Sequence, residues 1–441
     1  MKNSHDYKQT EIGRIPKEWE VVRLGEIVSN FENGIWGEKP DIEGESYPVI
    51  RSTEITHDGK IELSTVAYRK IPQSKIDKYN LQNGDILIVG SSGSPRLIGR
   101  TALFEKKDNK IYLFSNFIVR IRPDKMNSKF LFYFLNSSKY HKFLLTFQQT
   151  STGLRNFPKK EFIKMRLPLP PLPEQKKIAE ILSTVDEAIE KVDMAIEKTE
   201  KLKKGLMQEL LSKGWRRKNE GGREYKETEI GRIPKEWKVA RIEDIGNVVT
   251  GTTPSTKVKE YWGKGLPFVT PTDFSNSKYV DRTERSVTQR GVEKARIIPK
   301  DSVMVTCIAS VGEVSMASEK CITNQQINTI ICRESINPHY IYYIMVFRKK
   351  VLKKWAGVTT SPIIKKSLFE KFQLPLPPLP EQKKIAEILS TVDKKLEMLH
   401  NRKNRYEKVK KGLMNDLLTG KKRVKVNKAL NSKSKILNKS K

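Results

Sequence analysis

The chain has 441 residues, a length that exceeds one ordinary hydrophobic core and predicts two or three domains. Hydrophobic residues make up 37% of it and aromatic residues 8%, which excludes a chain that is disordered throughout. The 84 lysines and arginines against 51 acidic residues give a net charge of +33, and such a surplus attracts a polyanion, with nucleic acid as the first candidate.

The sequence also predicts a soluble protein of a reducing compartment such as the cytoplasm. No apolar stretch follows Met1, and the longest apolar run, 340–347, is too short to span a bilayer. Cys307, Cys321 and Cys332 are an odd number of cysteines at wide spacings, which argues against a disulfide framework.

Two blocks of sequence occur twice, which indicates an internal repeat. YKQTEIGRIPKEW at 7–19 returns with a single change at 225–237, and LPLPPLPEQKKIAEILSTVD at 167–186 returns unchanged at 374–393. The intervening segments differ almost everywhere. Identical flanks indicate one partner that is bound twice, and divergent middle segments indicate two different targets.

In chain order, each middle segment predicts strands, then a short aromatic helix and a polar loop. The predicted strands are 47–50 and 85–89 in the first segment and 266–270 and 302–308 in the second; the predicted helices are 129–135 and 339–347. These elements indicate mixed α+β domains.

A long helix is predicted after each middle segment. Pro173 and Pro380 suit the first turn, Glu174 and Glu381 suit the positive end of the helix dipole, and Gly214 and Gly420 suit the helix ends. Apolar residues recur at steps of four and three, as in a coiled-coil seam. The seam consists of Ile178, Leu182, Val185, Ile189, Val192 and Ile196 in the first helix and of Ile385, Leu389, Val392, Leu396 and Leu399 in the second.

We expect the two helices to pair in antiparallel orientation, with the two α+β domains at opposite ends. Packing of each helix on its own domain alone is the alternative. From Glu174 to Leu211, the first helix would be roughly 57 Å long.

The order of variable segment, PLPPLPEQ-type helix, second variable segment and second such helix resembles the specificity subunit of type I restriction-modification enzymes. The EIGRIPKEW openings and the paired LPLPPLPEQKKIAEIL blocks carry this resemblance, which covers 7 to about 420. It implies an α+β fold with two globular target recognition domains joined by two long antiparallel coiled-coil helices. The expected division is 1–168 and 228–375 for the recognition domains, 169–214 and 376–420 for the spacer helices, 215–227 for a linker and 421–441 for a flexible basic tail.

The resemblance implies that each domain recognises one half of a bipartite DNA sequence, while the helices set the spacing and dock two methyltransferase subunits. Restriction subunits that hydrolyse ATP and cut DNA would join them. S-adenosylmethionine, ATP and Mg are then expected in the partner subunits, and this chain would have no catalytic, cofactor or metal site.

Sequence features that resemble catalytic motifs have plainer explanations. The run 337–340, Asn-Pro-His-Tyr, lacks the second proline of the adenine methyltransferase motif NPPY, and helix capping by Asn337 explains it. Asp58-Gly59 is typical of a hairpin turn rather than of a nuclease metal site. The loop 90–99 is rich in glycine but lacks the P-loop pattern, and the cysteines with His339 lack metal-ligand spacing.

DNA contacts are predicted in loops that follow strands or precede the long helices. Base recognition needs side chains such as Arg, Asn, Gln, Ser or Thr, and phosphates attract lysine and arginine. In the first domain the predicted contacts are Arg51, Ser52, Thr53, Ser91, Ser92, Arg96, Arg155, Asn156, Lys159 and Lys160. In the second domain they are Thr270, Thr272, Asp273, Ser310, Thr359, Thr360, Ser361, Lys365 and Lys366.

Two other hypotheses compete with the specificity subunit. One is a fused enzyme with its own methyltransferase or nuclease, which the missing cofactor and nucleotide motifs count against. The other is a coiled-coil adaptor that binds nucleic acid without sequence preference.

Overall fold

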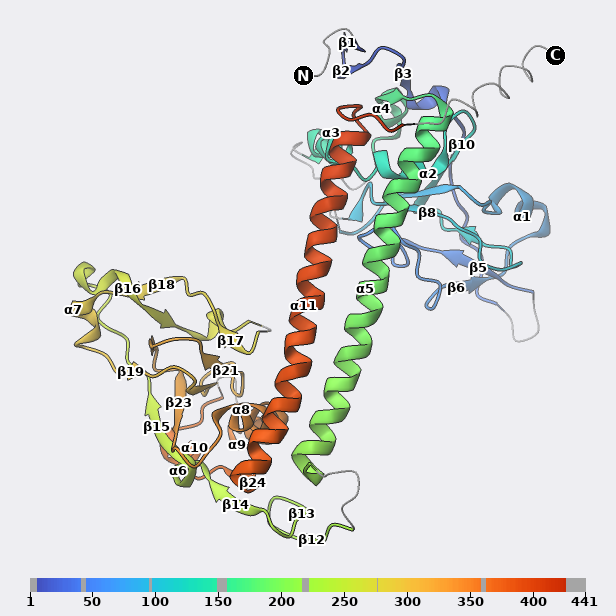
Figure 1. The fold of residues 1–441 in the computed structure, drawn as a ribbon. Coiled ribbons are helices and arrows are strands. Elements are labelled where there is room, and N and C mark those ends of the chain that lie inside the picture. Colours follow the sequence, from blue (N-terminus) through green and yellow to red (C-terminus); the bar gives the residue numbers. More distant parts are fainter. Residues whose placement is uncertain are drawn as a thin grey trace, which may run out of the picture. The chain divides into compact units, whose positions relative to one another are not determined.

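The computed structural model of the chain describes residues 6–40, 45–94, 97–148, 157–215, 222–275, 277–357 and 362–425. Two compact units divide the chain: the first comprises 1–191 with 403–441, and the second comprises 192–402. Each unit therefore takes part of two long helices, α5 (Leu172–Lys213) and α11 (Leu379–Leu417), which Figure 1 draws in green and red. Among the described helices, none is both long and apolar enough to cross a membrane.

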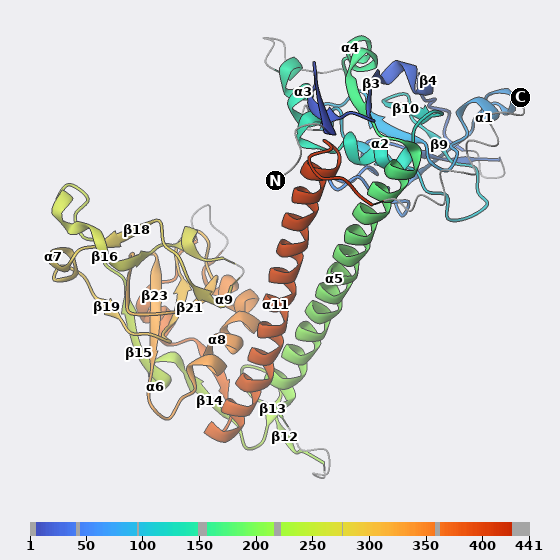
Figure 2. The ribbon, with the colours of Figure 1, turned by 45° about the horizontal axis from the view of Figure 1, so that its top comes forward.

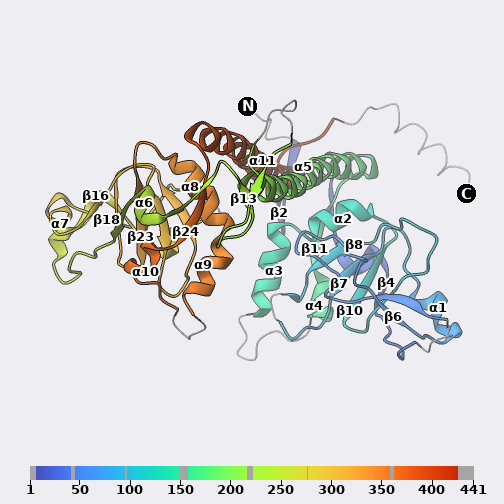
Figure 3. The same cartoon turned by 90° about the horizontal axis from the view of Figure 1, so that it is seen from below.

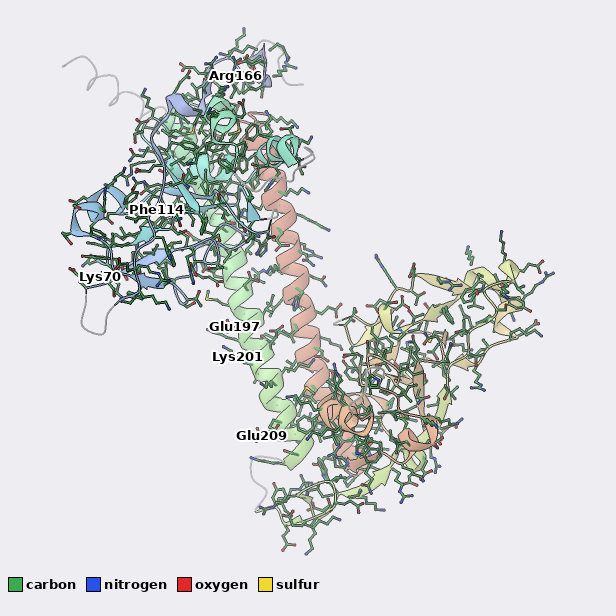
Figure 4. All side chains as sticks on the ribbon, turned by 180° about the vertical axis from the view of Figure 1, so that it is seen from behind. Lys70, Phe114, Arg166, Glu197, Lys201 and Glu209 are labelled. Carbon is green, nitrogen blue, oxygen red and sulfur yellow. The ribbon has the colours of Figure 1, made fainter. Side chains whose placement is uncertain are left out.

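The first unit is built around two small sheets. Its elements before α5 are β1 (Tyr7–Thr10), β2 (Gly13–Pro16), β3 (Glu20–Arg23), η2 (Leu24–Glu26), β4 (Val28–Asn33), β5 (Tyr47–Ile50), β6 (Ala67–Arg69), α1 (Gln73–Tyr79), β7 (Ile86–Val89), β8 (Thr101–Leu103), β9 (Leu113–Phe114), β10 (Ile118–Pro123), α2 (Ser128–Phe134), α3 (Ser138–Gln148), α4 (Lys159–Lys164) and β11 (Arg166–Leu169). One sheet has the strand order β4-β10-β7-β8 and the other β6-β5-β9. Phe114, labelled in Figure 4, is fully buried in the unit's interior.

The second unit repeats this arrangement with one more strand in each of its two main sheets. Its elements before α11 are β12 (Tyr225–Lys226), β13 (Ile233–Pro234), β14 (Lys238–Arg241), α6 (Ile242–Ile245), β15 (Gly246–Thr250), η4 (Lys259–Tyr261), β16 (Trp262–Val269), η5 (Pro271–Asp273), β17 (Tyr279–Val280), β18 (Arg285–Val287), α7 (Gln289–Val292), β19 (Ile297–Ile298), β20 (Val303–Thr306), β21 (Val314–Ala317), β22 (Cys321–Thr323), β23 (Ile327–Cys332), α8 (Pro338–Phe347), α9 (Lys349–Trp355), α10 (Lys366–Glu370) and β24 (Gln373–Leu376). Its sheets have the orders β15-β23-β20-β21-β17 and β18-β16-β22-β19.

Most strands of the two units correspond, while β17 and β19 of the second unit have no counterpart among the described strands of the first. In the larger sheets β4, β10, β7 and β8 correspond to β15, β23, β20 and β21, and in the smaller sheets the parallel pair β5–β9 corresponds to β16–β22. β7 and β20 are four-residue strands, ILIV and VMVT, that are buried throughout. Their β-branched side chains favour the strand conformation and pack well on a buried sheet. The predicted α+β repeat is thus confirmed.

An aromatic helix joins each larger sheet to the start of a long helix. Figure 3 shows α2 between α5 and the strands of the first unit, and Figure 2 shows α8 and α9 beside the sheet of the second. The Tyr133 hydroxyl donates to Asp186 Oδ2 at 2.8 Å, and the Tyr343 hydroxyl donates to Asp393 Oδ2 at 2.6 Å. Burial, with the nearby aspartate, raises the pKa of both tyrosines, so the hydroxyls stay protonated donors.

The two long helices pair in antiparallel orientation within each unit. In the first unit, Ile178 and Leu182 near the start of α5 share a core with Leu417 at the end of α11. In the second unit, Ile385 and Leu389 near the start of α11 share a core with Leu210 and Leu211 at the end of α5. Every predicted seam residue is buried or half-buried, and each helix also packs on its own sheet domain.

Ion pairs repeat the same antiparallel relation. Lys410 of α11 lies 2.6 Å from the Asp186 carboxylate of α5 in the first unit. Lys203 of α5 lies 2.7 Å from the Asp393 carboxylate of α11 in the second. The aspartates occupy equivalent positions of the duplicated block, and each binds a tyrosine of its own domain and a lysine of the other helix.

A glutamate at the first turn of each long helix, buried in the first unit and half-buried in the second, connects three segments of its unit. Glu174 is 2% exposed and accepts from the Trp19 indole at 2.9 Å and from the Arg423 Nε at 2.7 Å. Glu381 accepts from the Trp237 indole at 2.9 Å and from Arg223 Nη1 at 2.9 Å. We call these two arrangements the glutamate latches.

Each latch arginine lies just beyond the end of the other long helix. Gly420 and Gly214 follow those ends with φ of +70° and +81°, a conformation that glycine adopts without strain, so the predicted helix stops are confirmed. Of the predicted basic tail the structure describes 421–425, and Arg423 in that stretch belongs to the first latch.

Truncating the chain at two nearby positions should distinguish the contribution of the latch to stability from that of the rest of the tail. Removal of all residues after Lys422 deletes Arg423 and leaves the buried Glu174 carboxylate with one donor fewer, so we expect a loss of about 2 kcal/mol of unfolding free energy. Removal of all residues after Lys425 keeps the latch and should leave stability unchanged. Thermal and urea unfolding of the two truncated chains measures the difference, and equal stabilities would contradict the latch.

Candidate nucleic-acid interface

Four loops meet at one edge of the two sheets in the first unit. The Ser115 amide donates to the Ile50 carbonyl at 2.9 Å, which joins the loop after β5 to the β9–β10 loop. The Gly90 amide donates to the Phe117 carbonyl at 2.8 Å, and the Phe157 amide donates to the Gly90 carbonyl at 2.7 Å. We call 51–54, 90–94, 115–117 and 157–160 the first loop cluster.

The same hydrogen bonds form the second loop cluster, which we define as 270–273, 307–312, 324–326 and 362–366. The Asn324 amide donates to the Val269 carbonyl at 3.1 Å, and the Cys307 amide donates to the Gln326 carbonyl at 2.8 Å. The Ile364 amide donates to the Cys307 carbonyl at 2.8 Å. The two clusters therefore have equivalent backbones.

A glycine fixes the position of the β9–β10 loop and of its counterpart, the β22–β23 loop. The Gly34 amide donates to the Ile118 carbonyl at 3.2 Å, and the Gly251 amide donates to the Ile327 carbonyl at 3.1 Å. A Cβ at Gly34 would lie 1.9 Å from the Phe114 carbonyl oxygen, and one at Gly251 would lie 2.1 Å from that of Asn324. Only glycine permits this close approach. The β9–β10 loop is therefore held against the end of β4, and the β22–β23 loop is held against the end of β15.

The predicted base contact Arg51 is bound to a buried carboxylate of its own loop. Arg51 Nη2 lies 2.6 Å from Glu54 Oε1, and the Arg51 side chain is 37% exposed while that of Glu54 is fully buried. The Thr53 hydroxyl also donates to Glu54, at 2.9 Å. Burial raises the pKa of Glu54, but the hydrogen bonds from Arg51 and Thr53 outweigh burial and leave the pKa below its ordinary value. One edge of the guanidinium is thus committed to Glu54.

Thr270 and Asp273 form the equivalent turn in the second cluster. The Thr270 amide and hydroxyl both donate to Asp273 Oδ2 at 2.7 Å, so these two predicted contacts hold the turn together. Thr272 is exposed on the same turn, with its hydroxyl 2.8 Å from that of Thr270. Ser52 in the first cluster is half-buried and Thr53 is exposed.

The other predicted contacts that the structure describes also lie in the clusters. Ser91 and Ser92 are half-buried, and Ser310 is exposed. Among the lysines, Lys160 and Lys365 are exposed, Lys159 donates to Asn33 Oδ1, and Lys366 lies 3.4 Å from Glu370. Outside the described residues lie Arg96, Arg155, Asn156, Thr359, Thr360 and Ser361. The DNA-contacting roles of all these residues stay predictions.

The residues at the centre of each cluster were not among the predicted contacts. The loops 115–117 and 324–326 carry Ser-Asn-Phe and Asn-Gln-Gln, and Asn116, Phe117 and Gln325 are exposed. The Gln325 side chain accepts from the Thr253 hydroxyl at 2.6 Å. The available signal was a pair of polar residues, Ser115-Asn116 and Asn324-Gln325, that ends one residue before β10 and β23.

The motifs that resembled catalytic ones have structural roles. The Asn337 side chain accepts from the Tyr340 amide at 3.0 Å, and the Asn127 side chain caps α2 in the same way. Gly59 takes φ of +81° in a turn between Thr56 and Lys60, which confirms the Asp58-Gly59 turn. Burial raises the pKa of Cys307, Cys321 and Cys332 to about 12, so each thiol stays protonated.

Replacing Glu54 should weaken the first cluster in a pH-dependent way. Because the folded-state pKa of Glu54 lies below its ordinary value of 4.5, its stabilising effect is present above about pH 4.5 and disappears as the pH falls through the folded-state pKa. Glu54→Gln should lower the unfolding free energy by about 2 kcal/mol at pH 7 and by less in acid. Urea unfolding at pH 7 and pH 4 measures this, with the exposed neighbour Glu62→Gln as the control; a difference that is constant with pH would count against the interpretation.

Comparisons with known proteins agree with the repeated architecture. The family model described as type I restriction modification DNA specificity domain matches residues 16–198 and 234–408. The candidate type I restriction enzyme MjaX specificity subunit of Methanocaldococcus jannaschii is 31% identical over 428 residues, covering 95% of this chain and 97% of the relative. The MjaVIII specificity subunit of the same organism is 30% identical, covering 95% and 96%.

A solved structure shares the fold. The S subunit of the type I restriction-modification system from M. genitalium matches with a TM-score of 0.59 at 15% identity, covering 91% of this chain and 96% of that chain. The family match extends over both copies of the repeat and includes the first part of each long helix, up to residue 198 in α5 and residue 408 in α11. The chain belongs to the family of type I restriction-modification specificity subunits.

Proposed function

We propose that each loop cluster recognises one half of a bipartite DNA sequence. One observation carries the proposal: the clusters share a hydrogen-bonded backbone and differ in the side chains at equivalent positions. Arg51 with Glu54 stands where the second unit has Thr270 with Asp273. Two loop clusters with the same backbone and with different side-chain donors and acceptors are suited to recognising different base sequences.

The charge of the chain supports contact with the DNA backbone. The net charge is +33, and the exposed Lys160 and Lys365 lie in the last segments of the two clusters, 157–160 and 362–366. Lysines at such positions neutralise phosphates and position a protein on the duplex without reading its sequence.

We assign the chemical steps to partner subunits. In this proposal the helices set the spacing between half-sites and dock two methyltransferase subunits, restriction subunits join the complex, and S-adenosylmethionine, ATP and Mg belong to those partners. Exposed apolar side chains on the helices, outside their buried seam, support docking: Met194 and Leu202 on α5 and Met398 and Val409 on α11 are 47%, 51%, 72% and 50% exposed. Figure 4 labels Glu197 and Lys201, an exposed ion pair on the same part of α5. Crosslinking of labelled S-adenosylmethionine to the full chain alone would instead support a fused methyltransferase.

Selection from a random duplex library should return two short motifs with a fixed gap. Exchanging 20–166 with 238–373 should exchange the positions of the two motifs, because the flanking blocks are nearly identical. Sequencing of the bound duplexes measures both results. A single continuous motif, or none, would contradict the proposal, and no preference at all would favour the coiled-coil adaptor.

Removing single lysines should separate phosphate contacts from base contacts. Lys160→Ala and Lys365→Ala should each weaken binding equally on cognate and unrelated duplexes, and each should reduce the slope of log affinity against log salt by about 0.9. Lys366→Ala is the matched control, because Lys366 already pairs with Glu370 and should contribute less. Fluorescence anisotropy titrations at several salt concentrations measure the slopes; a loss confined to the cognate duplex would contradict a phosphate role.

A further inference from the structure

Phe117 is an exposed aromatic residue held at a fixed position in the first loop cluster. The residue is 55% exposed, although a phenylalanine ring gains about 1.5–3 kcal/mol on burial. Its carbonyl accepts from the amides of Gly90 and Ser91 at 2.8 and 3.1 Å, and the Ile118 amide closes the loop onto Ser115 at 2.9 Å. The backbone beneath the ring is therefore fixed before any partner binds.

The side chain at the equivalent position of the second unit is polar. The Gln326 carbonyl accepts from the Cys307 amide as the Phe117 carbonyl accepts from the Gly90 amide, and the Ile327 amide closes onto Asn324 at 3.2 Å. The frame around Phe117 thus tolerates a polar residue, so the fold does not require an aromatic ring there. The exposed phenylalanine ring is therefore explained better by a molecule that the loop binds than by the fold.

We propose that Phe117 recognises the methyl group of a thymine in the first half-site, an inference that rests on the proposed function. The thymine C5 methyl is the apolar group that a base pair presents in the major groove, and phenylalanine is among the side chains that contact it. The neighbouring Asn116 is exposed and carries an amide, the group that pairs with the N6 and N7 edge of adenine. An apolar side chain beside an amide matches what A·T pairs present.

Gln326 then marks a difference in specificity between the two domains. The Gln326 side-chain oxygen accepts from Asn324 Nδ2 at 2.9 Å, so its amide nitrogen is the group suited to a hydrogen-bonding base edge, and the adjacent Gln325 supplies a second amide. The second half-site therefore needs no thymine methyl at the corresponding position.

Replacing thymine by deoxyuridine tests the proposal, because uracil lacks only the methyl group. The full chain is titrated with duplexes that carry its selected site, in which each thymine of the first half-site is replaced in turn. At one position we expect the affinity of the unaltered chain to fall about four-fold, which corresponds to ~0.8 kcal/mol for one buried methyl group. Phe117→Ala and Phe117→Gln should bind the thymine and uracil duplexes equally, whereas Gln326→Ala, the matched control, should keep the four-fold difference.

The possible results separate this inference from the function on which it rests. If the chain selects two motifs but Phe117→Ala keeps the full sensitivity to uracil, the role of Phe117 is wrong and the proposed function stands. If no bipartite site is selected, the proposed function itself fails. A 2-aminopurine beside the thymine that brightens on binding, and no longer does so with Phe117→Ala, would overturn methyl recognition in favour of a ring inserted between bases.

Discussion

Glu174, which is buried, and Glu381, which is half-buried, lie at the first turns of the two long helices, and each accepts hydrogen bonds from an indole N–H and an arginine of segments distant in sequence. A carboxylate removed from water is costly unless its oxygens are fully hydrogen-bonded. The latch therefore forms only when the opening segment, the start of one helix and the end of the other are all in place. This requirement defines the geometry of each unit at the point where domain and helix join.

The same requirement explains which parts of the sequence are duplicated. Besides the glutamate, Gln175 and Gln382 accept from the amides of Asn127 and Asn337 and donate to proline carbonyls, and both glutamines are 2% exposed. None of these side chains can change without leaving a buried polar group unpaired. The loop clusters are held by backbone amides and carbonyls instead, so their side chains are free to differ between the two units.

Periodicity and repetition predicted the helices and their seam, because burial along a helix leaves a signal at every third or fourth residue. The β5, β7, α2 and α8 segments were also predicted closely from local patterns. The loop 115–117 was missed because its position depends on pairing between strands far apart in sequence. Likewise, the sequence does not show that the partner of Arg423 is a buried glutamate, since Glu174 lies 249 residues from Arg423.

The two units differ in the additional contact between domain and helix. In the second unit, Lys278 Nζ lies 3.1 Å from Ser390 Oγ and 3.3 Å from the Tyr343 hydroxyl, and burial lowers the pKa of Lys278 to about 8. In the first unit, Lys60 lies 3.6 Å from Glu190 in an exposed pair, and such pairs contribute about 0–1 kcal/mol. Because the half-buried Lys278 needs its hydrogen-bond partners more than the exposed Lys60 needs Glu190, the contact in the second unit specifies geometry more strictly than the contact in the first unit. The placement of the first domain on its helix therefore depends more heavily on Glu174 and on the bond between Tyr133 and Asp186.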